Sequence, residues 1–201
     1  MTKRPTKKPT ATARASVRRA LQRALRLRHS VRVERYDGLD NVYGFPLAIG
    51  KELVLLHFTK DFALDGYVVL PLSQIAEATL SAVQKFFDRV LNDRGDLRRV
   101  QLPKHEVALD TWIECARSLA ATPQLLIVEC ENRDSSIDAT FYLGTIVAVS
   151  DDSMAMCDVD ATAEWHDKPP AEIPYIDLTW IRFGDVYSRT FRKYVDTQPS
   201  Y

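Results

Sequence analysis

The chain has 201 residues, of which 46% are hydrophobic and 27% charged, and its formal net charge is zero. This composition excludes an intrinsically disordered chain, a collagen and a disulfide-rich miniprotein, and the length suits one large domain or two small ones. Three widely spaced cysteines without a Cys-x-x-Cys pattern favour a reducing compartment, and no apolar run reaches the roughly 18 residues of a membrane span. We therefore expect a cytoplasmic protein that does not span a membrane.

The zero net charge hides an uneven distribution along the chain. Residues 1–35 hold twelve lysines and arginines against one acid, Glu34, whereas the remainder holds 15 bases against 26 acids. A basic end of this kind indicates contact with nucleic acid or with another anionic surface.

Two segments are expected within the basic end. Residues 1–13 are rich in lysine, threonine and proline and predict a disordered basic tail. From Arg14, apolar residues at helical spacing are interleaved with arginines, which predicts a short basic amphipathic helix. The sequence leaves three interpretations of this helix open: a helix docked on its own domain, an arm that contacts phosphates, or a membrane-surface or targeting helix similar to an organelle transit peptide.

Short strands are expected after the basic helix. An alternating stretch, residues 30–36, is followed after a turn by a hairpin over residues 42–62. Residues 67–75 predict a further strand, in which Pro71 indicates an edge position or a bulge. The apolar period then changes to that of a helix over residues 79–95.

The second half of the chain repeats this order of elements. We expect a helix, four strand segments and a closing helix, at residues 107–121, 124–132, 140–150, 153–160, 173–183 and 186–195. In this comparison Gly44 matches Gly144, and Leu72–Ile75 matches Leu178–Ile181. Because the order of the matches is consistent, we interpret the chain as an internal duplication.

The duplication predicts two small domains after the tail of residues 1–13. The first covers residues 14–95 and the second residues 96–201. Short strands with hairpin turns and no long crossover predict a small antiparallel barrel or curled sheet in each. Each domain is small enough that the two are expected to bury surface against each other.

Three longer phrases resemble a known group of proteins: LVLLHFTKDFALDGYVVLPLSQI, YLGTIVAVSDDSMAMCDVD and IPYIDLTWIRFGDVYSRTFRKYV. They are similar to uncharacterised bacterial proteins with two Sm-like barrels of the SH3 type in tandem, and the likeness covers roughly residues 28–195. Ile181–Tyr187 is similar to the phrase before the last helix in that group. The resemblance implies a mainly β (α+β) fold of two tandem Sm-like/SH3-type barrels, each flanked by short helices, and no established activity.

The resemblance does not extend to the RNA-binding residues of true Sm proteins. Those proteins read RNA bases through a paired aspartate and asparagine in one loop and an Arg-Gly pair in another. The matching loops here, Thr59–Phe62 and Val149–Asp152, lack the first pair, and Arg182–Asp185 only loosely resembles the second. We therefore expect neither the uridine pocket nor the ring assembly of Sm proteins.

No group of residues predicts catalysis, a cofactor or a metal. The four histidines are scattered, and the Walker, Gly-x-Ser-x-Gly and His-Glu-x-x-His motifs are absent. His57 lies in an apolar strand and is expected in the core, and the three cysteines are expected to be small buried hydrophobes. The acids around Asp151 and Asp158 lack the glycine and glutamate of a calcium loop. We expect no catalytic, cofactor-binding or metal-binding residues, and no enzyme.

Both closing helices interleave aromatic and basic residues, namely Lys85, Phe86, Phe87 and Arg89 in the first copy and Tyr187, Arg189, Phe191, Arg192, Lys193 and Tyr194 in the second. Such helices can stack on bases while their cations neutralise phosphates. The interpretation we favour is that Phe87, Phe191 and Tyr194 plug their barrels while the basic groups stay in solvent.

The first functional hypothesis is therefore a non-enzymatic binding or adaptor protein with a weak, salt-sensitive nucleic-acid contact. The residues expected at this contact are the arginines of the basic helix and the bases of the last helix: Arg14, Arg18, Arg19, Arg23, Arg26, Arg28, Arg189, Arg192 and Lys193. The alternative is a protein-interaction module without nucleic-acid binding, dimeric and using a barrel groove or a strand edge.

Overall fold

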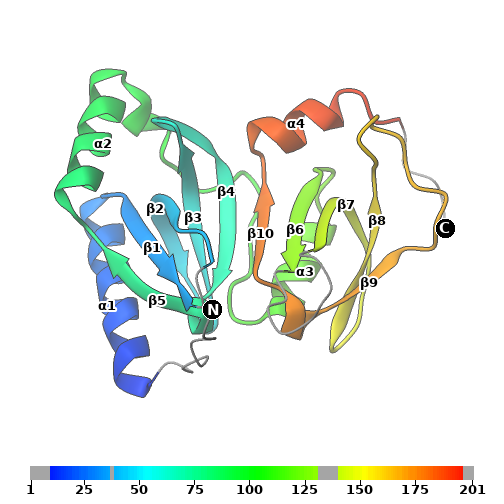
Figure 1. The fold of residues 1–201 in the computed structure, drawn as a ribbon, viewed down its shortest axis with the longest axis horizontal. Helices are drawn as coiled ribbons and strands as arrows, with labels where there is room; N and C mark the ends of the chain where they lie inside the picture. The colour runs from blue at the N-terminus through cyan, green and yellow to red at the C-terminus, as the bar shows by residue number, and fades with distance from the viewer. Residues whose placement is uncertain (1–9, 37–38, 131–139, 197–201) are drawn as a thin grey trace, which may run out of the picture. The chain divides into compact units, whose positions relative to one another are not determined.

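The computed structural model describes residues 10–36, 39–130 and 140–196 (Figure 1). The chain forms two compact units, residues 1–65 with 69–102, and residues 66–68 with 103–201. The boundary thus falls at residues 102–103, whereas the sequence predicted it at 95–96. The described residues form a mainly β fold with four α-helices, which confirms the predicted fold class at this level. No helix in the described ranges is long and apolar enough to cross a membrane.

The first unit is a five-stranded sheet with a helix before it and a helix after it. Its strands run in the order β5-β1-β2-β3-β4, and the pairs β1–β2, β1–β5 and β2–β3 are antiparallel. The elements are α1 (Ala11–Leu27), β1 (Val31–Arg35), β2 (Val42–Ile49), β3 (Leu53–Lys60), β4 (Ala63–Pro71), the 3-10 helix η2 (Leu72–Gln74), β5 (Ile75–Thr79), α2 (Ala82–Asp93) and the 3-10 helix η3 (Asp96–Arg99).

The second unit has the same order of elements along the chain, and its strands run β10-β6-β7-β8-β9. In each unit the closing helix lies across one end of the strands (Figure 1). Among the described residues the two outer strands of each unit do not pair with each other, so neither sheet closes. The elements are α3 (Trp112–Ala120), β6 (Leu126–Cys130), β7 (Thr140–Val149), β8 (Ser153–Asp158), β9 (Ala171–Pro174), the 3-10 helix η4 (Tyr175–Asp177), β10 (Trp180–Phe183) and α4 (Val186–Arg192).

The central hairpins of the two units have the same register around a glycine. Val31 lies opposite Gly44 and Leu126 opposite Gly144, and β2 and β7 each have a register irregularity a few residues later. A Cβ atom at Gly44 would lie 2.5 Å from the carbonyl oxygen of His57. A Cβ atom at Gly144 would lie 1.9 Å from the carbonyl oxygen of Cys157. Only glycine permits this close approach, which explains why both units keep it.

One predicted match between the halves is wrong. Leu72–Ile75 does not correspond to Leu178–Ile181, because the short helix η4 occupies the place of η2. Tyr175 N–H donates to the carbonyl of Asp152 (2.9 Å), as Leu72 N–H donates to the carbonyl of Glu52 (2.8 Å). Ile75, which caps η2, therefore corresponds to Leu178, and both are buried.

The basic helix begins earlier than predicted and is docked on the first unit. Thr10 caps α1, so residues 10–13 are not part of a disordered tail, while residues 1–9 lie outside the described residues. The helix buries Val17, Leu21 and Ala24 against β2 and β5. Of the three interpretations left open by the sequence, the structure shows the docked helix.

Candidate nucleic-acid interface

Three arginines of α1 form a stripe on the side of the helix that faces solvent. The helix advances by about 100° per residue, so Arg19, Arg23 and Arg26 lie within one sector opposite the buried apolar residues. All three are exposed, and α1 contains no aspartate or glutamate. Arg14 is exposed on the flank of the same helix. The stripe is about 10 Å long, given the rise of an α-helix.

Two of the predicted contact residues hold α1 in place. Arg18 Nη2 donates to the carbonyls of Gly50 (2.7 Å) and Lys51 (2.9 Å) in the β2–β3 turn. Arg28, in the left-handed position that ends α1, donates to the carbonyl of Val100 (3.2 Å). Both guanidinium groups thus anchor the helix to its own unit.

A groove of about 390 Å³ lies beside the end of α1. Arg28 and Arg98 line it together with apolar side chains that include Phe45 and Leu47. Arg98 is exposed at this groove. We call the three residues Arg19, Arg23 and Arg26 the basic face of the first unit.

The predicted contact residues of the last helix belong to the second unit. Arg189 Nε donates to the carbonyl of Asp185 (3.2 Å), and Arg192 Nε donates to the carbonyl of Pro123 (3.1 Å). Lys193 is exposed. Tyr194, expected to plug a barrel, is 73% exposed, so that part of the prediction is wrong.

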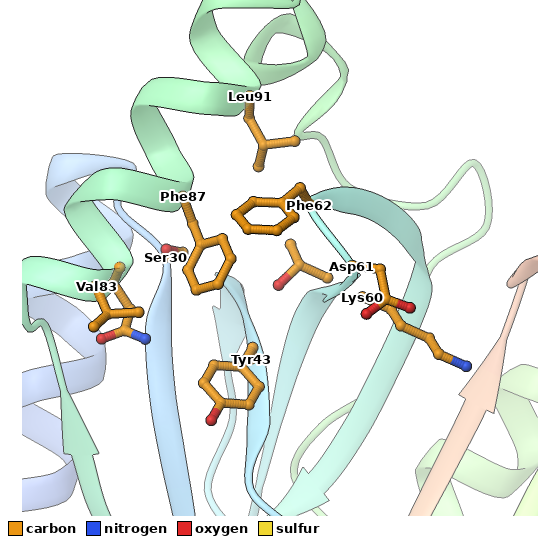
Figure 2. A pocket seen from close by; sticks show the side chains of 10 residues that line it. Ser30, Tyr43, Lys60, Asp61, Phe62, Val83, Phe87 and Leu91 are labelled. Carbon is orange, nitrogen blue, oxygen red and sulfur yellow. The ribbon is translucent and has the colours of Figure 1, made fainter.

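The first unit also contains an aromatic cavity of about 340 Å³ between α2 and the β3–β4 turn (Figure 2). The rings of Phe62 and Phe87 lie side by side beneath α2, with centroids 4.5 Å apart, and Tyr43 faces them from β2. Phe62 and Phe86 are 38% and 45% exposed, so these rings are not fully covered by the protein. Sequence reasoning assigned Phe87 to the core and did not identify this cavity.

The β3–β4 turn places Phe62 at the cavity. Asp61 and Phe62 both have positive φ, 46° and 62°, as in the two-residue turns that normally contain asparagine and glycine. A phenylalanine in this region is a conformational outlier with a cost on the order of 1 kcal/mol or more. Arg94 Nη1 donates to the carbonyl of Phe62 (3.0 Å), which ties the turn to the end of α2.

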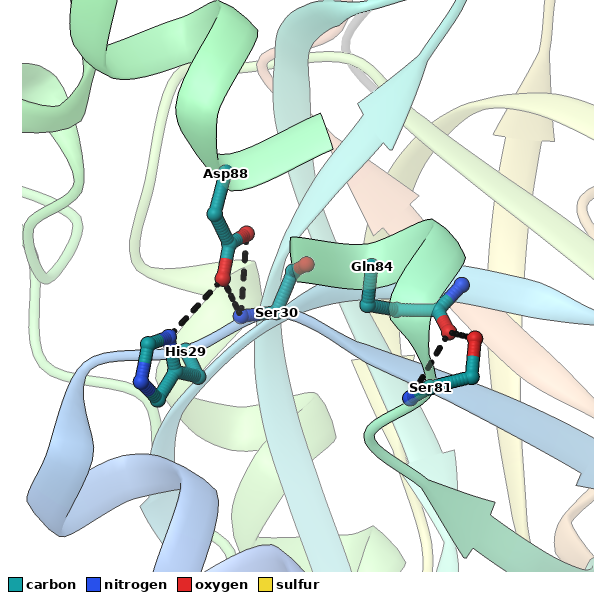
Figure 3. A network of polar contacts seen from close by, with 5 residues as sticks. All are labelled: His29, Ser30, Ser81, Gln84 and Asp88. Atoms are coloured by element: carbon teal, nitrogen blue, oxygen red, sulfur yellow. Dashed lines mark hydrogen bonds and ion pairs between the residues drawn. The ribbon is translucent and has the colours of Figure 1, made fainter. Parts of the chain in front are cut away.

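A polar network at the base of α2 connects the cavity to the end of α1 (Figure 3). The buried carboxylate of Asp88 accepts from the Ser30 N–H (3.3 Å) and lies 2.9 Å from His29 Nδ1. Gln84, also buried, accepts the N–H of the helix cap Ser81 through its side-chain oxygen (3.2 Å). Ser30 and Gln84 both line the cavity, so this network sets their positions.

Two buried titratable groups outside the cavity have pKa values shifted by burial. Burial, with a smaller contribution from Arg99, lowers the pKa of His57 to about 4, so its imidazole is neutral near pH 7. Burial raises the pKa of the Cys115 thiol to about 12, and all three cysteines are buried. Within the described part of the chain, no three histidine, cysteine, aspartate or glutamate side chains gather as metal ligands.

Comparison of the chain with protein-family models, with curated proteins and with solved structures gives no match. The likeness to tandem Sm-like barrels therefore stays a prediction from the sequence.

Proposed function

We propose that the protein is a non-enzymatic binding protein that contacts nucleic acid through the basic face of its first unit. The observation that carries this proposal is the solvent-facing stripe of Arg19, Arg23 and Arg26 on a helix docked by its opposite side. A docked helix presents its cations in fixed positions, which lowers the entropy lost when they bind phosphates.

The stripe is difficult to explain by stability alone. Like charges three or four residues apart destabilise a helix by about 0.2–0.5 kcal/mol per pair, and α1 has no acidic residue to compensate. An anionic partner would neutralise the three guanidinium groups and release counterions from its phosphates. We therefore assign the stripe to binding.

We also propose that each unit is an Sm-like version of a small SH3-type barrel and that the two arose by tandem duplication. The support is the shared succession of a helix, four strands, a 3-10 helix, a fifth strand and a closing helix. The matching glycine registers at Gly44 and Gly144 support it independently.

The proposal is tested by measuring the affinity of the full-length protein for single-stranded and duplex DNA between about 50 and about 200 mM salt. In the triple variant Arg19→Gln/Arg23→Gln/Arg26→Gln, we expect the affinity to fall at least tenfold. The slope of log affinity against log salt concentration should become less steep by about 2, because three phosphate contacts are removed.

The matched control is the triple variant Lys104→Gln/Arg117→Gln/Lys168→Gln, which removes the same charge from exposed positions of the second unit. It should retain the affinity and the slope. An equal loss of affinity in both variants would show that the effect comes from the net charge alone and not from the basic face. An affinity that does not depend on salt would contradict the proposal.

The alternative function is protein interaction, and one observation favours it. Val83, Phe62 and Phe86 are 55%, 38% and 45% exposed, more apolar surface than isolated exposed residues require. If this surface forms a homodimer, sedimentation should show a concentration-dependent dimer that Phe86→Ser dissociates. A monomer at all concentrations would contradict the homodimer hypothesis.

A further inference from the structure

We infer that the aromatic cavity of the first unit takes one nucleobase of a single-stranded nucleic acid whose phosphates lie on the basic face. The inference rests on the proposed function and specifies its substrate class. It is carried by the cavity itself, by a buried hydroxyl that lines it, and by a comparison with the same place in the second unit.

The second unit has a hydrophobic cluster at the place that corresponds to the cavity of the first. The strand registers match Ser30 with Leu125, and the helix caps Ser81 and Asp185 match Phe87 with Phe191. By the same registers the remaining wall positions pair as Tyr43 with Leu143, Thr59 with Val159, and Leu91 with Val195. Of the second-unit residues in these pairs, Leu125, Leu143, Val159 and Val195 belong to one buried cluster. Phe191 is partly buried and packs against it, as do Ala163 and Trp165.

The cavity wall therefore has the polar residues Ser30, Tyr43 and Thr59 at positions where the second unit has aliphatic residues. Ser30 is 4% exposed and its Oγ has no hydrogen-bond partner among the described residues. Such a buried hydroxyl is unfavourable unless an ordered water or a ligand satisfies it. The Gln84 side-chain oxygen is occupied by Ser81, which leaves its NH₂ group as the end oriented for donation. A ligand with donors and acceptors on its edge suits this wall better than an aliphatic side chain does.

The remaining walls suit a flat ring. Phe62, Phe87 and Tyr43 supply aromatic faces, and base–aromatic stacking is the usual means of binding single strands without sequence preference. The cavity of about 340 Å³ falls within the range of small-ligand sites. Phe62 and Val83, which line the cavity, are 38% and 55% exposed, so solvent reaches its rim.

The charges around the cavity indicate where the phosphates lie. The carboxylate of Asp61 at the β3–β4 turn repels phosphate from that side, and Lys60 points its amino group away from the rings (Figure 2). On the opposite side Ser30 follows Arg26, the last arginine of the basic face, by four residues, so their Cα atoms are at most about 15 Å apart. A strand with one base in the cavity can therefore continue along the basic face.

The test uses the full-length protein and two labelled probes, a single-stranded oligothymidylate of about 12 nucleotides and an abasic strand of equal length and charge. We expect the oligothymidylate to bind about tenfold more tightly than the abasic strand, because stacking of one base contributes about this factor. Free thymidine monophosphate should bind more weakly than either strand, because it lacks the contacts to the basic face.

Two variants locate the preference at the cavity. Phe62→Gly removes one aromatic wall while glycine tolerates the positive φ, so the affinity for oligothymidylate should fall to the abasic value. Ser30→Ala should lower it about threefold. Neither variant should change the affinity for the abasic strand. The control is Tyr194→Ala, at a 73% exposed ring of the second unit, which should change neither affinity.

The outcomes separate this inference from the proposed function. Equal affinity for the two strands, or a preference that survives Phe62→Gly, overturns the base site and leaves backbone binding intact. Failure to bind either strand overturns both. A dimer that Phe62→Gly dissociates, without any preference for bases, overturns the inference in favour of the protein interface. Binding of free thymidine monophosphate as tight as that of the strand overturns the assignment to nucleic acid.

Discussion

The two units place a corresponding closing helix over their strands, but the first has a cavity lined partly by polar side chains beneath it and the second a hydrophobic cluster. The difference begins in the connection between the third and fourth strands. In the first unit it is the two-residue turn Asp61–Phe62, and in the second it is the excursion of residues 159–170, which brings Trp165 against the same hydrophobic cluster that Phe191 contacts. A short turn therefore leaves room for a ligand where a longer connection supplies core residues.

The largest expected effect comes from making the second unit resemble the first. Leu125→Ser should destabilise the protein by about 3 kcal/mol or more, because it removes buried apolar volume and buries a hydroxyl. The corresponding change in the first unit, Ser30→Ala, should raise stability by about 1 kcal/mol, because it removes an unsatisfied hydroxyl. Urea denaturation measures the free energy of unfolding of both variants. A similar loss of stability in the two would contradict the proposed difference between the cavity and the cluster.

An intermediate effect concerns two matched positions on the neighbouring strands. His57 lies opposite Phe45, which follows Gly44, and Cys157 lies opposite Thr145, which follows Gly144. The pKa of His57 is about 4 in the folded protein against 6.5 when unperturbed, so the unfolded chain binds the proton first. Stability should therefore fall as pH drops from about 6.5 to about 4, by about 3 kcal/mol in total.

The variant His57→Gln should lose this part of the pH dependence, whereas Cys157→Ser should keep it. Chemical denaturation at several pH values measures both. A profile that is unchanged in His57→Gln would place the acid sensitivity elsewhere.

The smallest expected effect is at the entrance of the cavity. Asp61→Asn removes the carboxylate that repels phosphate and suits the positive φ at this position, so affinity for oligothymidylate should rise about twofold at low salt. The gain should vanish at high salt because surface charges are then screened. A loss of affinity would mean that the carboxylate accepts a hydrogen bond from the base.

Much of the fold could be predicted from local patterns. Alternating apolar residues indicated β1, and the change of period indicated α2, although the helix begins at Ala82, after its cap Ser81, rather than at residue 79. The start of α1 was missed because the lysine- and threonine-rich sequence hides the cap at Thr10. The repeat was misaligned by three residues near Leu178 because η4 interrupts what reads as one continuous strand.

The candidate interface was predicted only in part. The arginines of α1 follow from charge and helical spacing, but the carbonyls that engage Arg18 and Arg28 come from distant segments that periodicity does not reveal. The aromatic cavity was missed for a similar reason, because Phe62 and Phe87 look like core residues in the sequence. Only the φ values of the turn and the hydroxyl of Ser30 distinguish an open cavity from a filled one.

The most direct test of this account is a nuclear Overhauser measurement on the full-length protein with bound oligothymidylate. Contacts from the thymine methyl group to the ring protons of Phe62 and Phe87, with none to Trp165 or Phe191, are the predicted result. Contacts at the second unit, or a bound strand whose methyl groups approach no aromatic ring, would contradict it.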